Sequence, residues 1–165
     1  MTIIGQARYF GETTGRTFQV ARQEATKNRS KSVEAEHLLL ALASAPTTVC
    51  GRVLIEAGLD RERIEALLRQ ERSESLAFAG VQVRGGMLPP ASGRETPSRL
   101  GTSANEAIRR GVAIGHAENR VRVGTDLLLG ILGADLGTVP RILALANIDR
   151  TRLTARVKTA RKKVD

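Results

Sequence analysis

The feature that most constrains the fold of this chain is an internal repeat. Residues 33–42 have a second version at residues 123–131, and each version places an acidic residue just before an aliphatic run. Aligning Leu39 with Leu128 sets an offset of 89 residues. The same offset matches six further pairs, which are Leu54/Leu143, Ala57/Ala146, Leu59/Ile148, Asp60/Asp149, Arg63/Arg152 and Ile64/Leu153. Seven matches in one register predict an internal duplication, so both halves should fold in the same way.

Composition indicates what kind of structure is repeated. Aromatic residues make up only 2% of the 165 residues, and there is no Trp. The core must therefore be built from Leu, Ile, Val and Ala, and together with abundant Arg and Glu this composition favours helices over sheets. The length fits one domain or two small halves that share a core. We predict an all-α protein.

Helical spacing of apolar residues and helix-capping residues predict four helices in each half. In the first half they are expected over residues 16–29, 34–42, 49–57 and from 61 onward; in the second half over 102–118, 124–134, 139–146 and from 150 onward. The run 38–42 is too apolar for a surface helix, so the second helix should be the buried one. Asp60 and Asp149 are suited to cap the fourth helices, and Gly58 to end the third.

The remaining segments set the domain boundaries. Residues 1–15 are expected to form an extended N-terminal arm, followed by repeat 1 at residues 16–74. Residues 75–101 are rich in Gly and Pro and too long for an ordinary connection, so they are predicted to be a flexible linker. Repeat 2 covers residues 102–165. It ends in the basic run 158–163, which suits a solvated helix end because cations offset the helix dipole there.

The formal net charge of +9 limits the kinds of partner. A nucleic acid, an anionic surface or an acidic protein would each be attracted by this field, and charge alone does not choose among them. The pairs Arg109-Arg110 and Arg120 with Arg122 motivate a basic helical nucleic-acid-binding protein as the alternative function. Against it, arginines are spread through the chain and aromatic residues for base stacking are scarce.

Several other classes of protein are disfavoured. No apolar run reaches 18 residues and no signal peptide precedes the first helix, so we expect a cytoplasmic protein without a membrane segment. No phosphate-binding P-loop motif is present. His37 and His116 with one cysteine cannot form a closed zinc site. Without a recognisable nucleophile and base, no catalytic residues, metal or cofactor are predicted, and Cys50 is interpreted as a small buried residue.

Three residues at the starts of the buried helices leave their roles open. His37 is interpreted as a hydrogen-bonding residue that fixes the loop before its helix. Glu36 and Asp126 lie in first turns, where an acid complements the helix dipole. Two acids on symmetry-related helices of a basic protein are also suited to bind a cation such as a guanidinium.

These motifs resemble the Clp N-terminal domain, the double repeat that precedes the ATPase modules of Clp (Hsp100) unfoldases. The resemblance rests on the run 36–42, its weaker copy 124–130, the segment 21–25 and Gly115-His116. It is nearest to the ClpC type and covers about residues 10–160. It implies eight helices arranged as two pseudo-twofold-related four-helix repeats. Since the chain ends soon after the last predicted helix, we expect a free-standing protein of this kind or a fragment.

The resemblance also implies a binding role. Such domains receive substrates and adaptors, and ClpC-type domains recognise phosphorylated arginine at two equivalent sites. In each site an acid faces the guanidinium, and a Thr near the start of the repeat's first helix helps to hold the phosphate. By position the acids are Glu36 and Asp126, and the second-repeat Thr is Thr102. Gly11 stands where the first-repeat Thr would fall.

The same resemblance implies further partners. Similar domains expose an apolar groove between the repeats, where adaptors and, in actinobacterial members, cyclic peptide antibiotics bind. Phe10 is the residue expected to line it. The leading hypothesis is therefore a monomeric, non-enzymatic module that binds Clp ATPase or protease subunits, adaptors or client proteins. Nucleic-acid binding remains the alternative.

Overall fold

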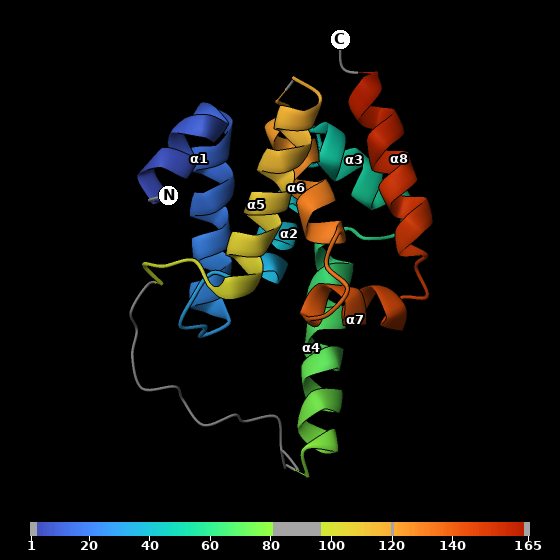
Figure 1. Ribbon diagram of the computed structural model, residues 1–165. Coiled ribbons are helices and arrows are strands. Elements are labelled where there is room, and N and C mark those ends of the chain that lie inside the picture. The colour runs from blue at the N-terminus through green and yellow to red at the C-terminus, as the bar shows by residue number, and fades with distance from the viewer. Residues whose placement is uncertain (1–2, 81–96, 120, 164–165) are drawn as a thin grey trace.

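The computed structural model describes residues 3–80, 97–119 and 121–163, and of residues 3–14 only the backbone. Over these residues the fold is all-α, with one isolated bridge between Val33 and Leu100. Figure 1 shows the eight helices, which are α1 (Ile3–Lys27), α2 (Ala35–Ala43), α3 (Val49–Glu56), α4 (Arg61–Phe78), α5 (Thr102–Ala117), α6 (Val123–Leu132), α7 (Thr138–Leu145) and α8 (Arg150–Lys162). The prediction of eight helices in two sets of four is confirmed.

The helix bounds repeat at the offset found in the sequence. Both ends of α7 lie 89 residues after those of α3, and α8 begins 89 residues after α4. Asp60 caps α4 by accepting a hydrogen bond from the backbone of Arg63, and Asp149 caps α8 in the same way. Gly58 has the predicted left-handed backbone, with φ of 74°, and Asn147 has φ of 54° at the matching position of repeat 2.

The two apolar helices form the centre of the fold. Residues 37–43 of α2 and residues 125–132 of α6 are all buried. Figure 1 shows α2 and α6 between α1 and α5 on one side and the remaining helices on the other. A helix that is apolar on all sides is stable only when neighbours cover all of them, so one core serves both repeats.

The predicted extended arm is wrong for residues 3–15, because α1 begins at Ile3 and continues without a break to Lys27. Residues 3–15 contain no proline. Their glycines and threonines each lower helix propensity by about 1 kcal/mol or less, which a helix anchored by the buried Ala21 and Ala25 can absorb.

The predicted linker is shorter than expected at both ends. α4 continues to Phe78, so residues 75–78 are helical. At the other end, residues 97–101 are described and contact repeat 1. The backbone N–H of Val33 donates to Arg99 O at 3.0 Å, and that of Gly101 donates to Val33 O at 2.8 Å. Residues 97–101 are therefore held against repeat 1. Residues 81–96, including the short strand considered at 81–83, lie outside the described residues.

Candidate functional site

Two of the predicted site residues line one cavity between the repeats. We call it the inter-repeat hollow; it has a volume of about 610 Å³. Its walls are the first turns of α2, α5 and α7, the side of α5 and the loop 133–137. Glu36 enters from α2, Thr102 from α5, and Thr138 and Arg141 from α7. Glu36 thus shares a cavity with the Thr of the other repeat, whereas the sequence suggested pairing within each repeat.

A polar junction holds the starts of α2 and α5 together. One carboxylate oxygen of Glu34 accepts hydrogen bonds from Ser103 N at 3.2 Å and Ser103 Oγ at 2.5 Å. Ser103 Oγ in turn accepts from the backbone N–H of Ala35 at 2.9 Å. A Cβ on Gly101 would lie 1.6 Å from the Glu34 carboxylate, so a larger residue there would displace this carboxylate from the junction. This junction fixes Glu36 and Thr102 relative to each other.

Glu36 is the half-buried acid among the residues that line the inter-repeat hollow. Its carboxylate is half-buried, and the described residues provide it with no ion pair or side-chain hydrogen bond. Burial raises the pKa of Glu36, and the nearby carboxylates of Glu34 and Glu71 raise it further, although its own backbone and Arg141 oppose the shift. A half-buried carboxylate without a cation is suited to accept one from a ligand.

His37 has the structural role expected from the sequence. Its Nδ1 accepts a hydrogen bond from the backbone N–H of Glu34 at 2.9 Å, which satisfies a donor at the start of α2. Burial lowers the pKa of His37, which favours the neutral ring that this acceptor requires. The role of His37 as a residue that fixes the start of the helix is confirmed.

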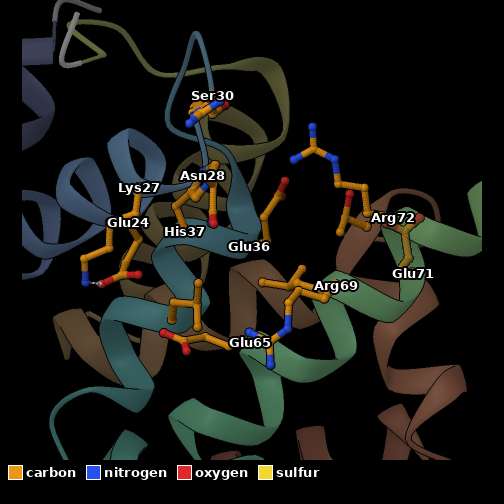
Figure 2. Close-up of a pocket in the computed structure, with 14 residues that line it drawn as sticks. Glu24, Lys27, Asn28, Ser30, Glu36, His37, Glu65, Arg69, Glu71 and Arg72 are labelled. Carbon is orange, nitrogen blue, oxygen red and sulfur yellow. Dashed lines mark hydrogen bonds and ion pairs between the residues drawn. The ribbon is translucent and has the colours of Figure 1, made fainter. Parts of the chain in front are cut away.

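A second cavity meets the first at Glu36. We call it the α1–α4 hollow, because it lies between α1, α2 and α4 (Figure 2). Figure 2 shows Glu36 on α2, and Glu65, Arg69 and Arg72 on the neighbouring α4. Glu36 and Thr138 line both hollows. The two hollows therefore adjoin each other at these two residues.

Asp126 lies apart from both hollows. Its side chain is 0% exposed, and its carboxylate accepts hydrogen bonds from Arg161 Nε at 2.6 Å and from the backbone N–H of Arg122 at 2.7 Å. Arg161 also forms an ion pair with Glu118. Burial alone would lower the pKa of Arg161, but the bonds to these two carboxylates hold that pKa above its ordinary value. The cation at Asp126 is thus supplied by the chain itself.

The offset between the repeats explains this placement. Asp126 lies 89 residues after His37, while Thr125 lies 89 residues after Glu36. Like His37, Asp126 accepts a backbone N–H at the start of its helix. Asp126 therefore replaces His37 in structure, although the motif aligned it with Glu36.

A protein-family model described as the Clp repeat N-terminal domain matches residues 9–143. The chain belongs to this family. Among solved structures, this Clp N-terminal domain is similar to the N-terminal domain of the caseinolytic protease associated chaperone ClpD from Arabidopsis thaliana. The two share 18% sequence identity with a TM-score of 0.65, over 93% of this chain and 94% of that one. No curated protein sequence matches.

The remaining sequence-based expectations concern Phe10, Cys50, and metal or membrane binding. The side chain of Phe10 lies outside the described part of the chain. Cys50 is buried as predicted, and burial, followed by the charge of Asp126, raises its pKa to about 12. Within the described ranges, no cluster of His, Cys, Asp and Glu could hold a metal ion, and no helix is long and apolar enough to cross a bilayer.

Arg161 is the residue that sequence reasoning missed. It was grouped with the solvated basic end of the last helix, but its side chain is only 2% exposed. The available signal was its position 89 residues after Arg72. The arginines that motivated nucleic-acid binding are also partly engaged, since Arg109 and Arg110 both pair with Glu106.

Proposed function

We propose that this Clp N-terminal domain is a non-enzymatic, cytoplasmic module that binds client proteins or adaptors of a Clp protease through the inter-repeat hollow. The family is one of substrate- and adaptor-binding modules of Clp ATPases. The observation that carries the proposal is the Glu36 carboxylate, half-buried in a cavity and without a cation in ion-pair contact among the described residues. A guanidinium group of a bound protein would supply that cation.

The walls of the same cavity favour an anion beside the guanidinium. The helices α5 and α7 begin at Thr102 and Thr138, each after a glycine that has no side chain to cap it. At α5 the Glu34 carboxylate already accepts the backbone N–H of Ser103, so the start of α7 is the more open of the two. Backbone N–H groups at such helix starts are donors that bind phosphate well. Thr102 adds a hydroxyl to this part of the wall, and Arg141 adds a guanidinium that is already paired with Glu71 through its Nε.

The Glu36 carboxylate and the anion-binding part of the wall together match a phosphorylated arginine. Its guanidinium would pair with Glu36, and its phosphoryl group would lie between Thr102 and the start of α7. Unmodified arginine satisfies only the acid, and phosphoserine satisfies only the anion site. We therefore propose selectivity for the phosphorylated guanidinium over both, and we propose one such site, because the acid of repeat 2 is bound by Arg161.

The test is a calorimetric titration with three peptides that differ only in carrying phosphoarginine, arginine or phosphoserine. We expect the phosphoarginine peptide to bind tightest, with a stoichiometry of one. Glu36→Gln should weaken it by about tenfold or more, because a charge-assisted hydrogen bond contributes about 1.5–3 kcal/mol. Thr102→Val should weaken it less.

The matched control is Glu62→Gln, which changes another exposed first-turn acid, on α4, away from both hollows. It should leave the affinity unchanged. Equal affinity of wild type and Glu36→Gln for the phosphoarginine peptide would reject the site, and absence of binding by wild type would reject the ligand.

A further inference from the structure

We propose that the α1–α4 hollow is a second subsite, which binds an acidic side chain close in sequence to the modified arginine of the same client protein. This inference rests on the proposed function, since it assumes that the modified arginine occupies Glu36. The second subsite gives the domain a preference for client sequences with an acidic residue near the modified arginine, and the arginines on α4 are responsible for it.

The acids of the α1–α4 hollow, other than Glu36, are already paired within the chain. Glu24 forms ion pairs with Lys27 and Arg61, both at 3.0 Å. Arg61 also pairs with Glu65 at 2.8 Å. These contacts leave Glu24 and Glu65 with little capacity to attract a cationic ligand.

Glu71 is engaged in the same way. It lies on α4 and is nearly buried, and its Oε1 accepts hydrogen bonds from Arg141 Nε at 2.6 Å and from Ser75 Oγ at 2.7 Å. Arg141 comes from α7 in repeat 2, so this pair also ties the two repeats together at the edge of the hollow. Three of the four acids that line the hollow are thus neutralised from within the chain.

The arginines of the hollow are not neutralised in this way. Arg29, Arg69 and Arg72 are exposed, and no carboxylate among the described residues pairs with them. In Figure 2, Arg72 extends from α4 on the side toward which the Glu36 carboxylate points, and Arg69 extends toward Glu65. Once a guanidinium occupies Glu36, the remaining charge of the hollow is positive. A carboxylate is the complementary group, since arginine binds it through two parallel N–H donors.

The comparison with repeat 2 supports this use of Arg72. Arg161, at the matching position, is buried against Asp126 and Glu118. Arg72 has no such acid and faces an open cavity next to Glu36. The same position is therefore a structural cation in repeat 2 and a cation available to a ligand in repeat 1.

The position of the second subsite limits where the acid can lie in the client sequence. The two hollows share Glu36 and Thr138, so a peptide with its modified arginine at Glu36 reaches the α1–α4 hollow on one side only. An extended chain advances about 3.3 Å per residue, so the acidic residue must be a near neighbour of the modified arginine. The preference should therefore depend on direction.

The experiment is a set of phosphoarginine peptides in an alanine background, with a single Asp moved from four residues before the modified arginine to four residues after it. We expect Asp on one side to tighten binding about two- to fivefold, the range for a partly exposed ion pair, and Asp on the other side to have no effect. The double variant Arg69→Gln/Arg72→Gln should lose this gain while still binding the all-alanine peptide.

The matched control is Arg63→Gln, an exposed arginine of the same helix that lines neither hollow. It should keep the full preference. Equal affinity for all Asp positions, or a preference that survives the double variant, would overturn the subsite. Phosphoserine that tightens binding where Asp does not would overturn the assignment to a carboxylate. Failure of the all-alanine phosphoarginine peptide to bind wild type would instead reject the proposed function.

Discussion

The first turns of the two buried helices carry acids in very different surroundings. Glu36 in repeat 1 is half-buried beside two cavities, and no cation of the described residues binds it. Asp126 in repeat 2 is fully buried and held by Arg161 at 2.6 Å. An acid in a repeated motif thus identifies a binding site only where the fold leaves it without a cation of its own.

Two glycines explain why Asp126, the acid of repeat 2, is buried. A Cβ on Gly130 would lie 2.0 Å from Ala107 O, and a Cβ on Gly111 would lie 2.7 Å from Asp126 O. Only glycine lets the backbones of α5 and α6 approach so closely. In repeat 1 the matching positions are Arg22 and Ala41. The tighter packing in repeat 2 brings Asp126 into the core, where a buried partner such as Arg161 is required.

The largest effect is expected when the cation of repeat 2 is removed. Arg161→Ala leaves the buried Asp126 carboxylate without its partner, which should lower the free energy of unfolding by about 3–5 kcal/mol. Arg72→Ala, the matched change in repeat 1, removes an exposed side chain and should cost about 0.5 kcal/mol or less. Urea denaturation followed by circular dichroism measures both.

A double variant separates the lost charge pair from the lost packing. Asp126→Asn keeps an acceptor for the N–H of Arg122 while removing the charge, so combined with Arg161→Met it should be less destabilised than the two single changes added together. If Arg161→Ala and Arg72→Ala cost the same, the two repeats do not differ in the way described above.

The next effect concerns the close approach of α5 and α6. Gly130→Ala places a methyl group against the carbonyl of Ala107, so the helices must separate, at a cost of about 1–3 kcal/mol. Gly15→Ala is the control: it also lies within a helix, but nothing lies within 4 Å of its Cβ position. It should raise stability by about 0.5–1 kcal/mol. Thermal unfolding that shows no difference between the two variants would contradict the close packing of repeat 2.

Sequence reasoning predicted the features that depend on local pattern. The offset of 89 residues, the caps at Asp60 and Asp149 and the turn at Gly58 follow from residues close together in the chain. The features it missed depend on distant residues. Asp126 is bound by a residue 35 positions away, and the starts of α2 and α5 are joined by Ser103, 69 positions from Glu34. Local periodicity carries no information about such pairs.

The site was predictable only in part for the same reason. The motif identified Glu36, and position identified Thr102, but their meeting across the two repeats required the fold. The motif alignment also matched Asp126 with Glu36, because it compared residue types and not the backbone N–H groups to which the side chains hydrogen-bond. The hydrogen bond from Arg122 N shows that Asp126 serves the group that His37 serves in repeat 1.

The smallest effect is expected on the free energy of unfolding when Glu36 is replaced. Glu36→Gln should be as stable as wild type at pH 7, or more stable by about 0.5 kcal/mol, because it removes a half-buried charge that forms no ion pair with the described residues. For a ligand-binding acid this is the expected combination: the substitution weakens phosphoarginine binding without weakening the fold. Urea denaturation of the two proteins, compared at a series of pH values, measures the difference.

The sign of the pH dependence follows from the raised pKa of Glu36. Burial favours the protonated acid in the folded state, so its contribution to stability is complete below the unfolded value of 4.5 and is lost as pH rises through the folded pKa. Any advantage of Glu36→Gln should therefore shrink as pH falls from 7 toward 4.5. His37, whose lowered pKa has the opposite effect, is present in both proteins and cancels in the difference. If Glu36→Gln is instead clearly less stable than wild type at pH 7, Glu36 has a stabilising partner in the fold, and the contrast with Asp126 fails.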